Sequence, residues 1–226
     1  MILRREFEKN LLDNLKALTL CLGCDILRYE ILDQVPNIEK LVVCDGSFKE
    51  MLRFKSPNNV DYSGLLSQLK ELHLESLQDL VAWRLPFLNL TCLKVKNCHS
   101  LSYLFTFSTA RSLTKLQRME IKECESIEEI VSKEEGEESD EDEIIFSQIS
   151  CLKLKNLRNL RRFYRGSLSF PLLEELSITY CNQMVALCAG TLEANKLSQI
   201  TINHNILMET DLNSTLRKEF LHKVCV

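Results

Sequence analysis

An apolar motif of the form L-x-x-L-x-L recurs eight times along this chain of 226 residues, and several copies are followed by x-x-C-x-x-L. Between the second apolar positions of successive copies, the steps are 23, 31, 21, 26, 33, 24 and 24 residues. Those positions are Leu18, Leu41, Leu72, Leu93, Met119, Leu152, Leu176 and Ile200. Such internal similarity predicts a repeat architecture, because a recurring unit of this length is typical of stacked structural repeats.

The L-x-L core of each copy has the period of two that is typical of a short strand with its apolar side chains on one side. One unit cannot bury this apolar side alone, so neighbouring units stack into a parallel sheet over a continuous core. The unit is a somewhat irregular leucine-rich repeat. We therefore expect an α/β solenoid, a horseshoe with a concave parallel β-sheet and an irregular or short-helical convex side. Eight strands about 4.8 Å apart would give a sheet roughly 35 to 40 Å long, which is a binding surface and not a pocket.

The repeats predict a single domain over residues 1–226. An acidic segment explains the longest spacing between successive repeats, 33 residues. Residues 133–143, KEEGEESDEDE, hold eight acids and one lysine. The net charge of the whole chain is −4, whereas the rest of the chain has 27 basic and 24 acidic residues, a net charge of +3. Such a dense block of like charges repels itself, so we expect a disordered loop insertion here. This loop is either solvated without a partner or makes an electrostatic contact with a basic patch. Ser139 is the candidate phosphorylation site in the loop.

Two further segments depart from the repeat. Residues 51–64 contain turn-forming residues and are interpreted as a loop, part of which packs as a helical turn through Phe48, Met51, Leu52 and Phe54. Residues 206–226 carry spaced apolar side chains and predict a helix or strand that caps the C-terminal end of the core.

The ten cysteines are mostly explained by the repeat. Cys24, Cys98, Cys124 and Cys181 stand at the same step after the strand, where a small side chain with a weak S–H donor suits a buried turn. Reduced structural thiols predict a reducing compartment, the cytoplasm or the nucleus. Cys21, Cys44, Cys92 and Cys151 are expected to be exposed. The C-x-x-C pair of Cys21 and Cys24 lacks the second pair of ligands that zinc needs, so we expect no metal site.

Motifs for catalysis are absent from the sequence. The four histidines are widely scattered, and no phosphate-binding, zinc-protease or hydrolase motif is found. Acidic residues are numerous, but the repeat places none of them in an apolar cleft that would tune its pKa. No apolar run reaches the length of a membrane span, and Glu6 and Glu8 stand where a secretory signal needs apolar residues. We expect no enzyme, no cofactor, no membrane span and no export signal.

The outward residues of the predicted strands form the candidate binding surface. Their central column reads Thr19, Val42, His73, Lys94, Glu120, Lys153, Ser177 and Thr201. Acids at the third repeat give way to lysines at the fourth and sixth, which could provide electrostatic complementarity to a protein partner. Nucleic acid is not expected, because the lysines are not interleaved with aromatic residues, and Trp83 and Phe105 are assigned to the core. The candidate partner-binding residues are His73, Lys94, Lys96, Arg118, Glu120, Lys122, Lys153, Lys155, Ser177 and Thr179. The alternative is that these residues only keep an exposed sheet face soluble and bind no partner.

The sequence within and between the repeats resembles that of a known family. The run L-x-x-L-x-L-x-x-L-x-x-L-x-x-W ends at Trp83, I-x-x-C-x-x-I-E-E-I-V covers residues 121–131, and F-P-x-L-x-x-L-x-I-x-x-C-x-x-M ends at Met184. These runs are similar to the C-terminal repeats of plant disease-resistance proteins of the coiled-coil, nucleotide-binding, leucine-rich-repeat class. Ser147, where the family often has proline, and Met119, where it usually has leucine, depart from the pattern.

This resemblance implies a role in innate immunity. The repeats would recognise a pathogen effector, or a guarded host protein that an effector modifies, and would hold the receptor's nucleotide-binding domain inactive until then. Neither a coiled coil nor a nucleotide-binding domain is found in the sequence, so ATP or ADP would bind only outside this chain. The chain is then a fragment of a receptor or a stand-alone repeat scaffold. An alternative is the substrate-recruiting domain of an F-box ubiquitin-ligase adaptor, which predicts more regular steps near 26 residues.

Overall fold

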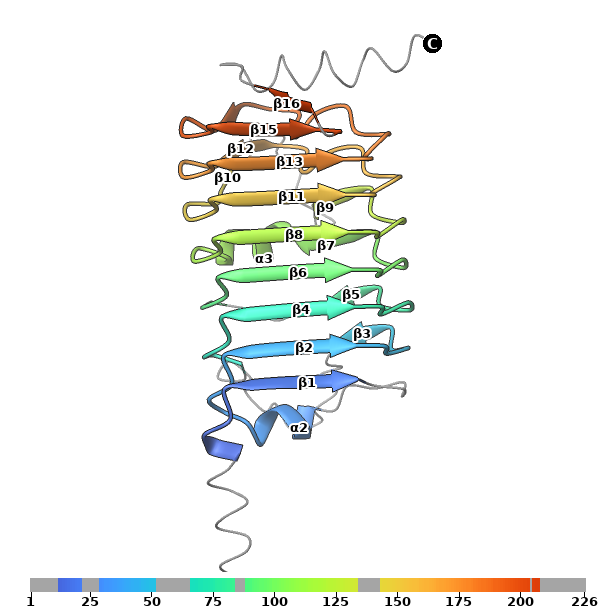
Figure 1. Ribbon diagram of the computed structural model, residues 1–226, viewed down its shortest axis with the longest axis vertical. Helices are drawn as coiled ribbons and strands as arrows, with labels where there is room; N and C mark the ends of the chain where they lie inside the picture. Colours follow the sequence, from blue (N-terminus) through green and yellow to red (C-terminus); the bar gives the residue numbers. More distant parts are fainter. Residues whose placement is uncertain are drawn as a thin grey trace, which may run out of the picture.

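The eight L-x-L motifs form eight neighbouring strands of one parallel sheet. The computed structural model describes residues 12–21, 29–51, 66–83, 88–133, 143–203 and 205–207. Within them the strands follow one another in chain order, with each strand hydrogen-bonded to the next (Figure 1). They are β1 (Ala17–Cys21), β2 (Lys40–Cys44), β4 (Glu71–Glu75), β6 (Cys92–Lys96), β8 (Arg118–Lys122), β11 (Cys151–Lys155), β13 (Glu175–Thr179) and β15 (Gln199–Ile202). The predicted leucine-rich-repeat solenoid is confirmed.

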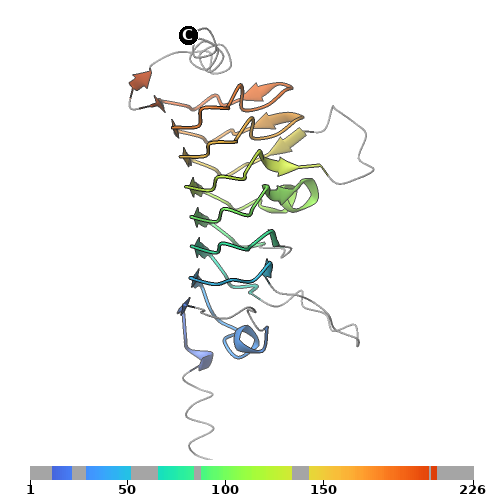
Figure 2. The same ribbon diagram turned by 90° about the vertical axis from the view of Figure 1, so that its right-hand side faces the viewer.

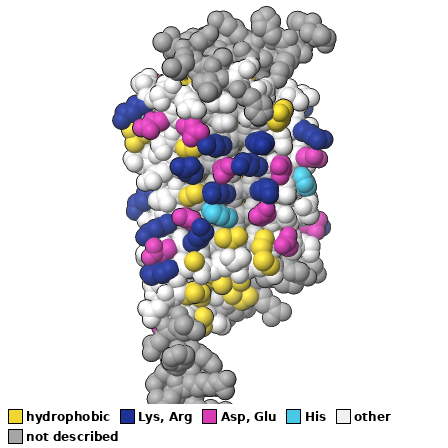
Figure 3. All heavy atoms as spheres, in the orientation of Figure 1, with side chains coloured by type: hydrophobic (Ala, Val, Ile, Leu, Met, Phe, Trp, Pro, Cys, Tyr) yellow, Lys and Arg dark blue, Asp and Glu magenta, His cyan; other side chains and the backbone are white. Residues whose placement is uncertain are grey.

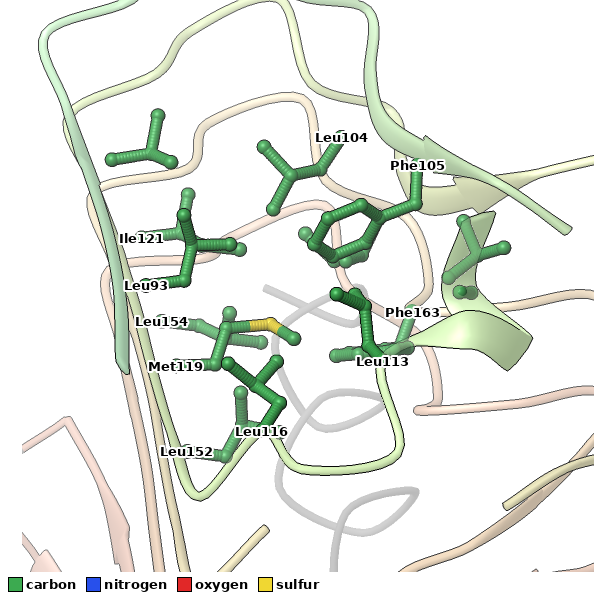
Figure 4. Close-up of a cluster of buried hydrophobic side chains, with 14 of the residues drawn as sticks. Leu93, Leu104, Phe105, Leu113, Leu116, Met119, Ile121, Leu152, Leu154 and Phe163 are labelled. Atoms are coloured by element: carbon green, nitrogen blue, oxygen red, sulfur yellow. The ribbon is translucent and has the colours of Figure 1, made fainter. Parts of the chain in front are cut away.

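The core runs along the stack behind the sheet. In β4 the side chains of Leu72 and Leu74 are buried while the residues around them are partly exposed, as period-two alternation requires. The same two positions are buried in each strand from β2 to β13. Leu93, Met119 and Leu152 thereby lie in one column, which faces Leu104 and Phe105 from the returning chain (Figure 4). Phe105 is in the core, as predicted, whereas the side chain of Trp83 lies outside the described part of the structure.

Short strands and helices line the other side of the stack (Figure 2). The parallel pairs are β3 (Glu50–Met51) with β5 (Ala82–Trp83) and β7 (Tyr103–Thr106) with β9 (Glu129–Ser132). A three-stranded sheet comprises β10 (Glu143–Ile145), β12 (Ser167–Ser169) and β14 (Leu192–Glu193). The helices with described bounds are α2 (Tyr29–Asp33) and α3 (Phe107–Ser112). Thr106 caps α3, since its hydroxyl accepts a hydrogen bond from the backbone N–H of Thr109.

The predicted special segments are described only in part. The prediction of a helical turn is wrong at Met51, because Glu50–Met51 forms a strand that pairs with the next repeat. Phe48 is buried. Residues 52–65, the acidic residues 134–142 with Ser139, and residues 208–226 of the predicted cap lie outside the described residues. At the start of that cap, β16 (Asn205–Leu207) pairs antiparallel with β15 and covers its open edge. No helix in the described ranges is both long and apolar enough to cross a membrane.

In the large sheet, each parallel strand from β2 to β15 is followed by a residue with left-handed backbone, which turns the chain beneath the sheet. These residues have φ between 46° and 56°, and they are Asp45, Ser76, Asn97, Glu123, Asn156, Tyr180 and Asn203. At most of these turns the backbone N–H donates to the last strand carbonyl of the next repeat, as Glu123 does to Lys155 at 2.9 Å. Asparagine and aspartate tolerate this conformation, but glutamate and tyrosine are strained in it.

Replacing Glu123 by asparagine will therefore stabilise the domain by about 0.5 to 1 kcal/mol, because the left-handed backbone costs asparagine less. The urea concentration at half-unfolding, followed by circular dichroism, measures the effect. Glu128→Asn is the matched control, since Glu128 is exposed and does not have a positive φ. An equal rise in the control would contradict the role assigned to the backbone at Glu123.

Candidate functional site

The sheet face aligns the candidate residues in register. Backbone pairing places Thr19, Val42, His73, Lys94, Glu120, Lys153, Ser177 and Thr201 opposite one another in a single column. A second column at the ends of the strands contains Glu75, Lys96, Lys122, Lys155 and Thr179. The register predicted from the motif spacing is therefore confirmed. What the aligned side chains bind remains a prediction.

Salt bridges neutralise part of this face. The Lys96 ammonium lies 2.8 Å from the Glu75 carboxylate on the neighbouring strand, and Lys153 lies 2.7 Å from Glu175. Lys40 pairs with Glu71 at 3.0 Å in the same way, and Lys122 pairs with Glu120 on its own strand. The Lys153 hydrogen bond holds the pKa of Glu175 below its ordinary value, and the Lys40 bond does the same for Glu71. Because these pairs are partly open to solvent, they add little stability.

Three cations of the face have no salt bridge to any described residue: Lys94, Arg118 and Lys155. They come from three strands, β6, β8 and β11. From β4 to β13 the face carries six cations and four carboxylates: Lys94, Lys96, Arg118, Lys122, Lys153 and Lys155 against Glu71, Glu75, Glu120 and Glu175. In Figure 3, lysine and arginine side chains gather over the middle of the sheet. The face thus has an excess of positive charge that its own acids do not neutralise.

His73 lies in the central column next to Lys94. Its Nε2 atom is buried, has no hydrogen-bond partner and is 3.8 Å from a carboxylate oxygen of Glu71. Burial, followed by the charges of Lys94 and Lys40, holds the pKa of His73 below its ordinary value. The lowered pKa favours the neutral imidazole, and its buried Nε2 atom lies beneath the surface of the sheet face.

Two residues expected to be exposed are buried. Thr179, a candidate partner-binding residue, is 7% exposed, and Cys151 is 4% exposed. Cys151 lies between Arg118 and Glu175 on the adjacent strands, and its thiol donates to the Glu175 carboxylate at 3.1 Å. Burial, with this carboxylate, raises the pKa of the Cys151 thiol to about 11. The short side chain of Thr179 is likewise recessed beside the long Lys155, so neither residue is available to a partner.

The turn cysteines match their prediction. Cys98, Cys124 and Cys181 are buried, and each Sγ lies 3.2 to 3.7 Å from the backbone carbonyl two residues before it. Cys24 lies outside the described residues. Cys21 is exposed, and Cys44 and Cys92 are only half-buried. The described cysteines are free thiols, and the turn positions use theirs as weak donors in a packed core.

A hollow of about 520 Å³ adjoins the ends of the strands, and the sequence pattern did not indicate it. Tyr180 lies in it with 46% of its surface exposed, next to the left-handed turns of two repeats. Its lining is polar: Glu123, Glu125, Asn156, Arg158, Asn159, Tyr180, Asn182 and Gln183. Because the lining comes from turns of three successive repeats, only the stacking of the repeats brings these residues together.

Comparison with known proteins places this surface in a family context. The family model described as plant disease resistance protein RPS2-like leucine-rich repeats matches residues 1–125 and 82–205. The chain is 24% identical over 192 residues to the probable disease resistance protein At5g63020 of Arabidopsis thaliana. The aligned region covers 78% of this chain and 21% of that protein. The chain is also 32% identical over 98 residues to the disease resistance protein RPS5 of the same plant. That aligned region covers 43% of this chain and 11% of RPS5.

No solved structure is significantly similar to the chain. The chain matches only 21% and 11% of the length of these two relatives. The family model, in contrast, matches most of the chain, from the first repeat to the eighth. The chain therefore belongs to the RPS2-like leucine-rich repeats of plant disease resistance proteins.

Proposed function

We propose that this chain is the ligand-recognition region of a plant intracellular immune receptor and that its sheet face binds an acidic surface of a pathogen effector or of a guarded host protein. The observation that carries the proposal is the set of unpaired cations on this face, Lys94, Arg118 and Lys155. The other cations of these three strands, Lys96, Lys122 and Lys153, already have carboxylate partners. A partner that supplies acids would complete the pairing.

The arrangement favours recognition of a protein surface. The three cations come from the successive strands β6, β8 and β11, and the polar hollow around Tyr180 lies at the turns that follow β8, β11 and β13. Charges of this kind govern specificity and association rate more than affinity, as a sensor of one particular partner requires.

Within a complete receptor, the same region would act on a nucleotide-binding domain. A ligand that binds the sheet face and favours the active receptor would shift the equilibrium by its difference in affinity for the two states. This role places the protein in the cytoplasm or nucleus, as a recognition module without catalysis. The family match supports this assignment over an F-box adaptor or a stand-alone scaffold.

Selection of peptides from a random display library on the immobilised chain tests the proposal. We expect the selected peptides to be rich in aspartate and glutamate and to bind more weakly as salt is raised, because counter-ions screen exposed charges. Replacing Lys94, Arg118 and Lys155 together by glutamate should weaken binding by at least about tenfold.

The matched control replaces Lys49, Arg111 and Lys196 by glutamate, which changes the net charge equally at exposed positions away from the sheet face. This variant should keep most of the affinity. Equal losses in both variants would mean that only net charge matters, and selected peptides without acidic residues would refute an acidic partner.

A further inference from the structure

Two cysteines meet at the N-terminal edge of the sheet. Cys21 ends β1 and Cys44 ends β2, and the two residues are direct partners in the parallel register. Their Sγ atoms are 2.7 Å apart, and the Cys44 Sγ also lies 3.6 Å from the backbone carbonyl of Leu20. Cys21 is exposed and Cys44 half-buried, so solvent reaches the pair. The C-x-x-C motif in the sequence suggests Cys24 as the neighbour of Cys21, but the fold brings Cys44 to it.

Other described cysteines lack this combination of a second sulfur and access to solvent. Cys92 and Cys151 lie on strands β6 and β11, which are separated by β8, with Arg118 between them in the register. Cys98, Cys124 and Cys181 are buried in the turns. Reactive thiols need exposure, and reversible oxidation needs a second thiol within reach. Among the described residues, Cys21 and Cys44 meet both conditions.

We propose that Cys21 and Cys44 form an oxidative modification site, at which a peroxide converts the two thiols into a disulfide. The Cys21 thiolate attacks one peroxide oxygen, the O–O bond breaks, and Cys21 becomes a sulfenic acid while one water is released. The Cys44 sulfur then attacks the Cys21 sulfur, the S–O bond breaks, and the second water leaves. The thiol pair loses two electrons and two protons, and hydrogen peroxide is reduced to two molecules of water.

The surroundings favour this order of events. The hydrogen bond with Cys21, followed by burial and the acidic groups of Asp45 and Glu75, raises the pKa of Cys44 to about 11. Cys44 therefore stays protonated while the exposed Cys21 reacts first. Oxidation of Cys21 removes the thiol that contributes most to this shift, so Cys44 can then lose its proton and resolve the sulfenic acid.

The disulfide would join the edge strand to the rest of the sheet. Among the described strands, β1 pairs with β2 alone. Its inward residues Leu18 and Leu20 are only partly buried, whereas those of β2 are fully buried. Edge strands with little burial open more readily than central ones. A covalent link between β1 and β2 limits that opening and fixes the N-terminal end of the sheet face.

The test uses the purified 226-residue chain, first reduced and then treated with hydrogen peroxide. Intact mass should fall by two hydrogens per chain, and peptide mapping should find Cys21 linked to Cys44, with reversal by dithiothreitol. Hydrogen exchange at the β1 amides should slow at least about tenfold on oxidation. Cys21→Ser and Cys44→Ser should each abolish the linkage, and Cys92→Ser, which alters a half-buried thiol of the same face, should keep it.

Three results would overturn the proposal. Linkage of Cys21 to Cys24 would assign the chemistry to the C-x-x-C motif. Conversion of Cys21 to sulfinic acid without a crosslink would show that Cys44 does not resolve it. Finally, the Asp45 carboxylate lies within 4.8 Å of both sulfurs. Zinc that purifies with the chain and blocks peroxide until it is chelated would make the cluster a metal site instead.

Discussion

Replacing Phe163 by alanine will lower the free energy of unfolding by about 3 to 5 kcal/mol. The ring is fully buried and meets Phe146 and Phe170 edge to face, with 5.7 Å between ring centroids in both pairs. Phe146 and Phe170 stack on each other at 5.4 Å. Removing Phe163 would leave a cavity beside rings from two successive turns of the solenoid, and those rings cannot close it without breaking their own contacts.

The midpoint of urea unfolding, monitored by circular dichroism, measures this loss. Ile145→Ala is the control, because Ile145 adjoins Phe146 in sequence but is 53% exposed, and its effect should stay within about 0.5 kcal/mol. If Phe163→Ala cost less than about 1 kcal/mol, the aromatic cluster would not be part of a continuous core.

The second large effect is expected at Glu129, the buried acid of β9. Its carboxylate accepts hydrogen bonds from the Arg165 Nε at 2.8 and 3.0 Å and lies 3.6 Å from the Arg162 Nε, which is buried and has no hydrogen bond. Glu129→Ala would leave the Arg162 guanidinium without its counter-charge. We expect a loss of about 2 kcal/mol, because one partner of a partly buried ion pair is removed while the other stays.

Glu128→Ala serves as the matched control for Glu129, since Glu128 is adjacent and exposed. Its effect on the urea midpoint should be close to zero. Glu129→Gln should fall between the two, because the amide oxygen can still accept a hydrogen bond from Arg165 but carries no charge. Equal stabilities for Glu128→Ala and Glu129→Ala would show that the contact with the arginines is not structural.

The sheet could be predicted from the sequence because its determinants are local. Each L-x-L core sets the inward and outward residues of its own strand, and stacking then aligns equivalent positions such as His73 and Lys94. The short pairs such as β7 with β9 were not predicted, since their sequences lack a period of two that distinguishes them from irregular chain. Strand formation there depends on backbone hydrogen bonds to the next repeat.

The details of the candidate site depend on neighbours one repeat away, which the motif does not encode. Lys96 and Lys153 were predicted together with Lys94 and Lys155 as a basic cluster, but the first two have carboxylates on the adjacent strands. Cys151 and Thr179 were expected to be exposed because only the strand period was considered, whereas both are buried. Cys151 lies in register between the longer Arg118 and Glu175 on the flanking strands. The contact of Cys21 with Cys44 required the register of two strands 23 residues apart.

Lysine footprinting of the chain in complex with a selected acidic peptide shows whether the sheet face is the surface that binds the partner. Acetic anhydride modifies exposed lysines, and mass spectrometry compares the extent of modification with and without the peptide. We expect Lys94 and Lys155 to be protected in the complex, while Lys49 and Lys196 react as in the free chain. Protection of Lys49 or Lys196 with unchanged reactivity at Lys94 and Lys155 would contradict recognition by the sheet face.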